Sequence, residues 1–345
     1  MVALLAAGCG GSNDADVGPV GGDRLVAIGA GLAGLEGFRA AVFAPGVPHV
    51  SAFAFDSRGR LWLTAAGSST HSGDGVYLIA RAGSPAVEVV GGMKAPLGLV
   101  WHAGTLYVSS FGRIDAFSDL RGTRFNRRTE IVAGPVANGE NNNIVLASDG
   151  RLLVGVSASC DHCVPSSPYL AAIVSFRTDG SDLEVYASGI RAAYGLAFSP
   201  GTSDLYASMN QRDDLEAKTP GDWLGHVEHG QDWGFPACYG QGGTACAGVP
   251  APVAVLGKHA AAGGVAIVDT GPLLINEAGP IALVAEWELG TVERVDLANA
   301  DSSSPQRATP FLSGLTNPLP VTTTPTGTLL VGDWATGTVY AITHP

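Results

Sequence analysis

The feature that most constrains the fold is a repeated pair of short apolar segments with a tight turn between them. In the first unit, residues 53–55 and 60–64 flank a turn that ends in Gly59. Similar units follow along the chain: 99–101 with 106–108, 144–146 with 152–154, 196–198 with 205–207, a weaker one at 281–284, and 321 with 329–331. Short apolar runs bounded by Gly- and Pro-containing turns are typical of β-strands, and the sequence has no convincing 3.6-residue periodicity.

One leucine marks each unit: Leu61, Leu106, Leu152, Leu205, Leu283 and Leu329. The steps between these leucines are 45, 46, 53, 78 and 46 residues. Two strands repeating at a period in the forties are typical of propeller blades, and several blades must stack in a ring because one blade cannot bury its own faces. The sequence therefore predicts an all-β, six-bladed β-propeller with a long inserted loop, residues 209–262, between blades 4 and 5. A multi-blade sandwich or a β-helix is the alternative.

An apolar run near the N-terminus ends in the pattern Gly29-x-Gly31-x-x-Gly34. This pattern has the form of a dinucleotide-binding fingerprint. In that fold a second strand should follow and end on an acidic ribose ligand, but Pro45 and Pro48 interrupt the chain there. We therefore interpret the segment as a Gly-rich opening strand and loop.

The chain has 345 residues, of which 46% are hydrophobic and 14% charged, and its formal net charge is −12. All-β architectures of this length often form one domain, so we expect a single propeller domain over residues 23–345. The negative charge and the lack of a Lys/Arg cluster argue against nucleic acid or an anionic membrane surface as a partner. No stretch of the sequence reaches the ~18 apolar residues needed to span a bilayer.

Cys9 ends the run LLAAGC, which resembles the lipobox of bacterial lipoproteins. In those proteins the cysteine is lipidated and becomes the first mature residue, so the resemblance implies an exported periplasmic or cell-surface lipoprotein whose lipid is its only membrane contact. We assign residues 1–22 to a signal remnant and a flexible Gly/Ser tether, with the true start of the precursor upstream. A chance cysteine near the terminus is the alternative.

The four remaining cysteines form an even set. In an exported protein this predicts two local disulfides, Cys160–Cys163 and Cys238–Cys246. A zinc site built from all four thiolates is the alternative, which export and the irregular spacing disfavour.

Polar residues concentrate where the chain leads into the third and fourth units. Residues 138–143, NGENNN, offer acceptors for a cation or for sugar hydroxyls, or else form a solvated turn. Arg191 could clamp a ligand carboxylate in bidentate fashion, or form an ion pair between blades.

The long loop after the fourth unit is rich in oxygen ligands that suit Ca²⁺, although it lacks EF-hand spacing. These residues are Asn210, Asp213, Asp214, Asp222, Glu228 and Asp232. Histidines in the same region could bind a metal or act as bases, or be solvated: His226, His229 and His259. Lys258, one of three lysines in the chain, stands beside His259.

Residues 189–198, GIRAAYGLAF, resemble the motif Gly-x-Arg-Asn-x-x-Gly-Leu-Ala-Phe of the glucose/sorbosone dehydrogenase family. The similarity continues in NQRDDL at 210–215 and in GQDWGFPACYG at 230–240, and it covers most of residues 50–343. Members of that family are soluble or lipid-anchored sugar dehydrogenases that depend on pyrroloquinoline quinone (PQQ) and are built as six-bladed propellers.

The resemblance implies that a Ca²⁺-polarised PQQ accepts hydride from a sugar or aldehyde, and it leaves the electron acceptor open. Because PQQ is a planar tricarboxylate, its binding candidates are cationic, polar and aromatic: Arg191, Asn210, Lys258, Trp287 and Trp334. The candidates for calcium are Asp213 and Asp222.

Three departures from the family pattern bear on catalysis. The Arg-Asn pair of the family is Arg191-Ala192 here, its Asp-Glu pair is Asp222-Trp223, and no histidine stands near Glu140, where the family has its base. Glu140, if burial raises its pKa, or His259 is then the candidate base. The alternatives are a propeller that binds a carbohydrate or a protein without turnover, and a metal-dependent lactonase with Glu140, Asn143 and Asn210 as ligands.

Overall fold

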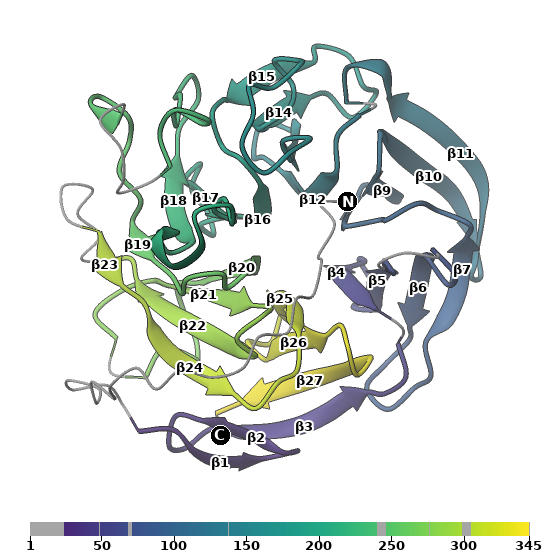
Figure 1. The fold of residues 1–345 in the computed structure, drawn as a ribbon. Helices are drawn as coiled ribbons and strands as arrows, with labels where there is room; N and C mark the ends of the chain where they lie inside the picture. The colour runs from purple at the N-terminus through teal and green to yellow at the C-terminus, as the bar shows by residue number, and fades with distance from the viewer. Residues whose placement is uncertain are drawn as a thin grey trace.

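The computed structural model describes residues 24–47, 49–67, 71–136, 138–239, 246–275, 277–298 and 305–344. Six β-sheets stand around a central axis and form a closed ring (Figure 1). The prediction of an all-β, six-bladed β-propeller is confirmed. The predicted signal remnant and tether (residues 1–22), with Cys9, lie outside the described residues, which begin at Arg24.

The first three blades are four-stranded antiparallel sheets made of consecutive strands. Blade 1 contains β4 (Val50–Phe55), β5 (Leu61–Ala65), β6 (Gly75–Ile79) and β7 (Val87–Gly91). Blade 2 contains β8 (Gly98–His102), β9 (Thr105–Ser110), β10 (Arg113–Arg121) and β11 (Arg124–Val132), followed by the 3-10 turn η1 (Gly134–Val136). Blade 3 contains β12 (Asn141–Leu146), β13 (Leu152–Val156), β14 (Ala172–Phe176) and β15 (Glu184–Ala187).

The other blades recruit strands from distant parts of the chain. Blade 4 contains β16 (Ala193–Phe198), β17 (Leu205–Met209), β18 (Trp223–Val227), β19 (Ala254–Val255) and, in parallel, β23 (Gln306–Arg307). Blade 5 contains β20 (Ala262–Val268), β21 (Ile281–Glu286), β22 (Thr291–Asp296) and β24 (Thr309–Ser313), extended by β2 (Leu32–Gly34) and β1 (Val26–Gly29). Blade 6 contains β25 (Pro318–Thr323), β26 (Leu329–Asp333), β27 (Thr338–Thr343) and β3 (Arg39–Ala44).

The six marker leucines all lie in the second strand of their blade, so the repeat seen in the sequence is the blade repeat. The long segment 209–262 supplies β18 and β19 of blade 4, and its polar loops precede and follow β18. One of them contains the 3-10 turn η2 (Glu216–Lys218). This segment accounts for the step of 78 residues between the fourth and fifth markers.

The N-terminal part of the chain closes the ring and extends its outer edge. β3 pairs with β27, with Ala41 opposite Ala341, so the last blade takes its outer strand from the start of the chain (Figure 1). β1 and β2 form a hairpin whose turn residues, Ala30 and Gly31, have φ values of 52° and 82°. Positive φ at both turn positions is typical of a two-residue hairpin. The Gly-x-Gly-x-x-Gly pattern thus lies in a Gly-rich β-hairpin, in agreement with its interpretation as an opening strand and loop.

Four inner strands contain a two-residue bulge opposite a small residue of the second strand. In blade 3 the bulge of Asn142 and Asn143 faces Gly155, where a Cβ would collide with the carbonyl oxygen of Ala193 in the next blade. Ser208, Ala285 and Gly332 stand at the matching positions of blades 4, 5 and 6. A bulge re-aims the side chains beside it, and here it does so next to the central channel.

The hydrophobic cores lie between neighbouring blades. Between blades 1 and 2, Trp62, Leu99 and Leu106 are almost fully buried together with Phe117. Burying one such side chain stabilises the fold by about 1.5–3 kcal/mol, so the stacked blades depend on one another. No helix in the described part of the chain is long and apolar enough to cross a membrane.

Both predicted disulfides are present. Cys160 and Cys163 are joined with their Cα atoms 6.0 Å apart, and Cys238 and Cys246 with theirs 5.0 Å apart. The prediction of two local disulfides is confirmed, and the zinc alternative is overturned because thiolates paired in disulfides cannot ligate a metal.

Candidate functional site

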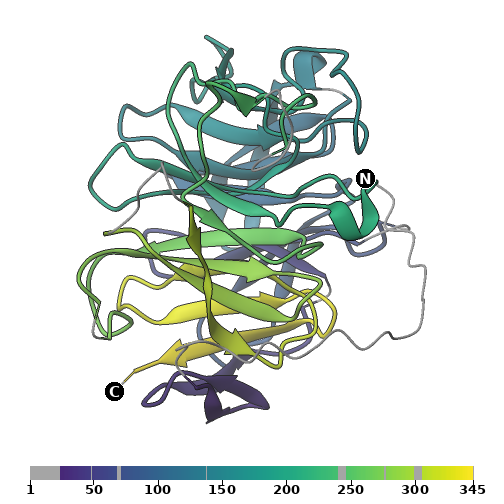
Figure 2. The same ribbon diagram turned by 60° about the vertical axis from the view of Figure 1, so that its left-hand side comes forward.

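The candidate side chains gather at one end of the ring. In each blade the inner and second strands are antiparallel, so the start of the inner strand lies at the same end as the finish of the second strand. We call this end the mouth face; Figure 2 shows the ring from the side. Residues at these positions are His49, Lys94, Glu140, Arg191, Asn210, His259, Trp287, Asn317 and Trp334.

Three aromatic side chains from blades 5, 6 and 1 form a half-buried cluster on the mouth face. Trp287 packs against Trp334 with ring centroids 5.6 Å apart, and Trp334 lies 4.4 Å from the ring of His49. The indole Nε1 of Trp334 donates to the carbonyl of Ala66 at 2.8 Å, which fixes the ring. The two tryptophans that the sequence nominated for PQQ binding therefore lie together, on the same face as Glu140 and Arg191.

Glu140 precedes β12 on the mouth face, beside the start of β16. Its backbone carbonyl accepts the amide of Ser157, and the next amide, that of Ala158, donates to the carbonyl of Arg191. Burial raises the pKa of Glu140, and the nearby charge of Arg191 opposes this. The hydroxyl of Tyr194, on the bulge of β16, is buried without a hydrogen bond, and burial together with the charge of Glu140 raises its pKa. A glutamate with a raised pKa is the chemistry expected of a general base working near neutral pH.

The asparagines after Glu140 connect blades. The side-chain amide of Asn141 donates to the carbonyl of Ser110 in blade 2 at 2.7 Å, and that of Asn142 donates to Ala193 in blade 4 at 3.0 Å. The amide of Asn143 reaches Leu196 at 3.4 Å. The Asn-rich segment is thus the first part of a buried strand, and its amide N–H groups join three blades.

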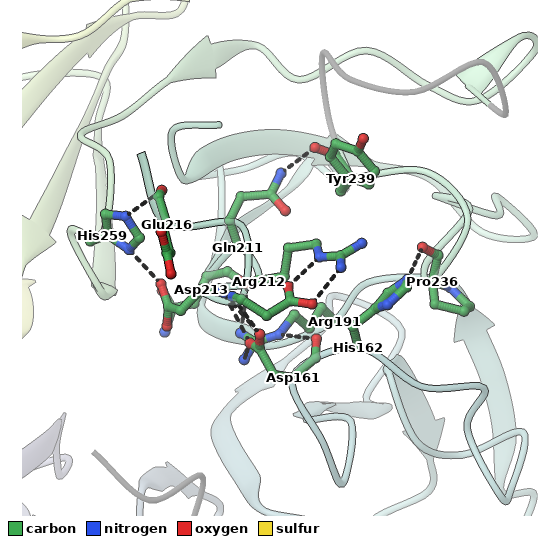
Figure 3. A network of polar contacts seen from close by, with 12 residues as sticks. Asp161, His162, Arg191, Gln211, Arg212, Asp213, Glu216, Pro236, Tyr239 and His259 are labelled. Atoms are coloured by element: carbon green, nitrogen blue, oxygen red, sulfur yellow. Dashed lines mark hydrogen bonds and ion pairs between the residues drawn. The ribbon is translucent and has the colours of Figure 1, made fainter. Parts of the chain in front are cut away.

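Arg191 is held by an ion pair between blades. Its Nη2 and Nε donate to Oδ1 and the backbone carbonyl of Asp161 at 2.5 and 2.9 Å, and its Nη1 donates to the carbonyl of Asn210 at 3.0 Å (Figure 3). Asp161 belongs to blade 3 and Arg191 precedes the inner strand of blade 4. Of the two roles predicted for Arg191, this arrangement corresponds to the ion pair between blades.

His259 lies in the loop before β20, with both ring nitrogens facing acceptors. Nδ1 is 2.7 Å from Oδ1 of Asp213 and Nε2 is 3.2 Å from the carbonyl of Glu216 (Figure 3). The hydrogen bond to Asp213 raises the pKa of His259. Two acceptors favour the doubly protonated ring, so His259 is less suited than Glu140 to take a proton. Its neighbour Lys258 is exposed, and Nζ donates to the carbonyl of Ala217 at 3.3 Å.

Asp222 lies at the interface of blades 4 and 5. It is 2% exposed, and its two carboxylate oxygens accept the backbone amides of Gln211 and Ala262 at 2.8 and 2.9 Å. Burial raises its pKa to about 7. Asn210, in the chain segment that Asp222 holds, has a buried side-chain oxygen without a hydrogen bond.

The predicted calcium pair is not assembled as a metal site. The Asp213 carboxylate contacts His259, whereas both oxygens of Asp222 are used by backbone amides. Within the described ranges, no three His, Cys, Asp or Glu side chains come together in a way that could hold a metal ion.

Sequence reasoning missed three side chains on this face. His49 precedes β4 just as Glu140 precedes β12, so an alignment of the six repeats would have nominated it. His71 contacts the buried carboxylate of Asp74 at 2.8 Å in the loop between β5 and β6. Asp161, the partner of Arg191, had only its place between Cys160 and Cys163 as a signal.

The fold matches solved structures described as sugar dehydrogenases and as a carbohydrate-active enzyme, over 89–97% of this chain. The PQQ-bound aldose sugar dehydrogenase of Streptomyces coelicolor is 18% identical, with 89% of this chain and 98% of that chain covered and a TM-score of 0.71. The PQQ domain of pyranose dehydrogenase from Coprinopsis cinerea is 15% identical, with 90% and 97% covered and a TM-score of 0.69. A Trichoderma reesei carbohydrate-active enzyme of family AA12 is 16% identical, with 97% and 100% covered and a TM-score of 0.71.

This chain has the propeller fold of the PQQ-dependent sugar dehydrogenases. No family model matches the sequence, and no curated protein matches it. At these identities the likeness shows the fold, and the chemistry must be argued from the side chains of this propeller.

PQQ has a flat ring system and three carboxylates, so its site needs an aromatic surface and cations. One indole ring of the Trp287–Trp334 pair can meet the first requirement, because the two rings are T-shaped, at 65° to each other, and do not form one continuous surface. For the second, the ammonium group of Lys94 lies over the neutral ring of Phe111 and that of Lys258 donates to the carbonyl of Ala217, and neither is in an ion pair with a described residue, whereas Arg191 is paired with Asp161. The mouth face therefore fits a planar anionic ligand, while Asp213 and Asp222 do not fit the calcium role predicted for them.

Proposed function

We propose that this propeller is a quinone-dependent dehydrogenase that binds PQQ at the mouth face and oxidises a sugar or an aldehyde there. The observation that carries the proposal is the meeting of Trp287 and Trp334 on the face that also carries Glu140. Structures of the same fold that are described as PQQ-bound support it.

In this proposal each group of the chain has a defined task. One indole ring of the T-shaped Trp287–Trp334 pair offers a flat apolar surface, and Lys94 and Lys258 offer positive charge to carboxylates. Glu140 accepts the proton of the substrate hydroxyl, because its raised pKa makes it a stronger base than an ordinary carboxylate. When bound, PQQ would supply the acceptor for the hydride of the substrate, which carries both electrons of the oxidation.

A second function, ligand binding without turnover, is favoured by one specific observation. Arg191, which the resemblance assigns to cofactor binding, has its guanidinium occupied by Asp161 and Asn210. A propeller whose Arg191 is occupied in this way would bind a carbohydrate or a protein at the mouth face without converting it.

Calorimetric titration of the full chain with PQQ, in the presence and absence of Ca²⁺, separates the two functions. Saturable binding followed by dye-linked oxidation of an aldose or aldehyde supports the dehydrogenase. Binding of PQQ without turnover, or of sugars without PQQ, supports the binding module. If PQQ does not bind at all, the dehydrogenase proposal fails. A dependence on Ca²⁺ would require oxygen ligands other than the Asp222 carboxylate.

The proposal includes export and attachment to a membrane through a lipid on Cys9. Two disulfides fit an oxidising compartment. In cells that export the protein, Cys9→Ser should release it from the membrane fraction, because the Gly/Ser tether offers no other membrane affinity. Unchanged fractionation of that variant would reject the anchor.

A further inference from the structure

The contacts of Arg191 define a site that is larger than one ion pair. Arg191 is 6% exposed, and a buried guanidinium is strongly destabilising without a counter-charge. Asp161 supplies that charge through a short contact of 2.5 Å between Nη2 and Oδ1. The aspartate side chain itself is 29% exposed, so its outer side faces solvent.

Two backbone amides complete the surroundings of this carboxylate. The N–H of Asp213 donates to the Asp161 oxygens at 3.0 and 3.1 Å, and the N–H of Asp214 donates to Oδ2 at 2.9 Å (Figure 3). The side chain of Asp214 turns away and forms a bidentate pair with Arg212. A guanidinium and two consecutive N–H groups aimed at one point form an anion-binding concavity.

The carboxylate in this concavity belongs to a four-residue ring closed by a disulfide. Asp161 and His162 stand between Cys160 and Cys163, whose disulfide is half-buried beside the exposed Val164. The other ring residue, His162, contacts the carbonyl of Pro236 at 3.2 Å. The loop that carries Asp161 is therefore attached to blade 4 by two side chains and is shaped by a half-buried cross-link.

We propose that Arg191 and the N–H groups of Asp213 and Asp214 form a carboxylate-binding site, that Asp161 is its internal ligand, and that the Cys160–Cys163 disulfide holds Asp161 in it. With the disulfide closed, the site is filled and the charge of Arg191 is neutralised. With the disulfide open, the loop is less constrained, and a small organic carboxylate can take the place of Asp161. This site is distinct from the aromatic cluster and does not depend on the binding of PQQ.

Opening the disulfide requires a dithiol. The S–S bond accepts two electrons and two protons, giving the thiols of Cys160 and Cys163, and the dithiol becomes a disulfide. Closing a four-residue disulfide loop restricts the chain enough to shift a conformational equilibrium by up to about 20-fold. We therefore expect the disulfide to raise the ratio of filled to empty site, with Asp161 as the ligand, by at most about 20-fold.

The carboxylate site is tested by removing its internal ligand. In the full chain, Asp161→Gly should lower the melting temperature, and sodium acetate should restore it saturably, while chloride at the same ionic strength should not. Wild-type protein should not respond to acetate. The matched control is Asp182→Gly, which removes the partner of the exposed Arg177. If Asp161→Gly does not fold, Asp161→Ala replaces it, because alanine also removes the carboxylate and leaves its place open to acetate. A response to acetate no larger than the response to chloride would overturn the site.

The role of the disulfide is tested by labelling Arg191 with phenylglyoxal and mapping the peptides by mass spectrometry. Labelling of Arg191 should rise several-fold when the wild type is reduced under native conditions, and also in Cys160→Ser/Cys163→Ser. It should not rise in Cys238→Ser/Cys246→Ser, which loses the other disulfide of the same region. Equal labelling with the Cys160–Cys163 disulfide open and closed, or an equal rise in the control, would overturn the proposed role.

Discussion

The side-chain amide of Asn142 joins blade 3 to blade 4 by donating to the carbonyl of Ala193 at 3.0 Å and to the hydroxyl oxygen of Ser157 at the same distance. Asn142 is fully buried, and it occupies the bulge of the inner strand next to the channel. Contacts of this kind tie neighbouring blades where hydrophobic packing alone would allow them to slide.

Asn142→Ala should therefore destabilise the ring. It leaves the carbonyl of Ala193 and the hydroxyl of Ser157 without this donor, which costs about 1–3 kcal/mol, while loss of the Asn142 Oδ1, which is buried without a hydrogen bond, offsets part of that cost. Chemical denaturation of the full chain measures this loss. Asn126→Ala is the control, because the amide of Asn126 donates to Asp119 on an exposed hairpin. Equal stability of the two variants would contradict the structural role of Asn142.

Much of the fold follows from the sequence because a blade is a local structure. Leu61 lies in the second strand of blade 1 and Leu329 in the second strand of blade 6. Each follows a Gly-containing turn by only a few residues, so the sequence pattern predicts the strand. Pairings between strands that belong to different repeats could not be predicted from the sequence. The pairing of Ala41 with Ala341, and of Val255 with Arg307, joins segments whose own pattern carries no information about their partner.

Trp287→Ala should weaken the binding of PQQ to the mouth face. Loss of an aromatic surface costs about 0.5–1.5 kcal/mol, which corresponds to an affinity about 2- to 13-fold lower. Trp334→Phe should bind almost normally but melt at a lower temperature, because it keeps a ring and loses the Nε1 donor to Ala66. Calorimetric titration and thermal unfolding measure the two effects. The control is Trp101→Phe, which changes a ring that stacks on Trp62 far from the mouth face. Unchanged affinity in Trp287→Ala would remove the aromatic cluster from the proposed site.

Glu293 should make the stability of the protein depend on pH. It is 8% exposed, and burial together with the carboxylate of Glu286 raises its pKa to about 7. A raised acid pKa means that the folded state prefers the neutral form, so the stability contribution is present at pH below 4.5 and is lost as the pH rises to about 7. At about 1.4 kcal/mol per pKa unit, a shift from 4.5 to about 7 makes the loss at most about 3.5 kcal/mol.

Glu293→Gln should remove the part of this dependence that Glu293 contributes, leaving the part due to Asp222, and should stabilise the protein at pH 8. Unfolding free energies at pH 5 and pH 8 measure it, with Glu36→Gln, a change on the exposed surface, as the control. The same pH dependence in Glu293→Gln and the wild type would assign the effect to other groups.

The candidate site was less accessible to sequence reasoning than the fold. The position of Arg191 at the start of an inner strand was readable, but its partner Asp161 is 30 residues earlier in a loop that reads as solvated. The sequence predicted Asp222 as a calcium ligand because the loop that contains it is rich in acidic residues. Only the structure shows that Gln211 and Ala262 use both of its oxygens. Whether a carboxylate binds a ligand, an arginine or the backbone depends on loops from other blades, which local sequence does not specify.

Glu140→Gln should abolish turnover while it spares PQQ binding, because glutamine keeps the shape of the side chain and cannot accept a proton. In the wild type the rate should fall as the pH falls through the pKa of Glu140, because only the ionised carboxylate acts as a base. Burial raises that pKa, so the acid limb of the pH–rate profile should lie above the usual glutamate value of about 4.3. The control is Glu184→Gln on the exposed edge strand β15, which should leave rate and profile unchanged. If the Glu140→Gln variant keeps its turnover, another group accepts the substrate proton. His49, which has the matching position in blade 1 and packs on Trp334, would then be the next residue to change.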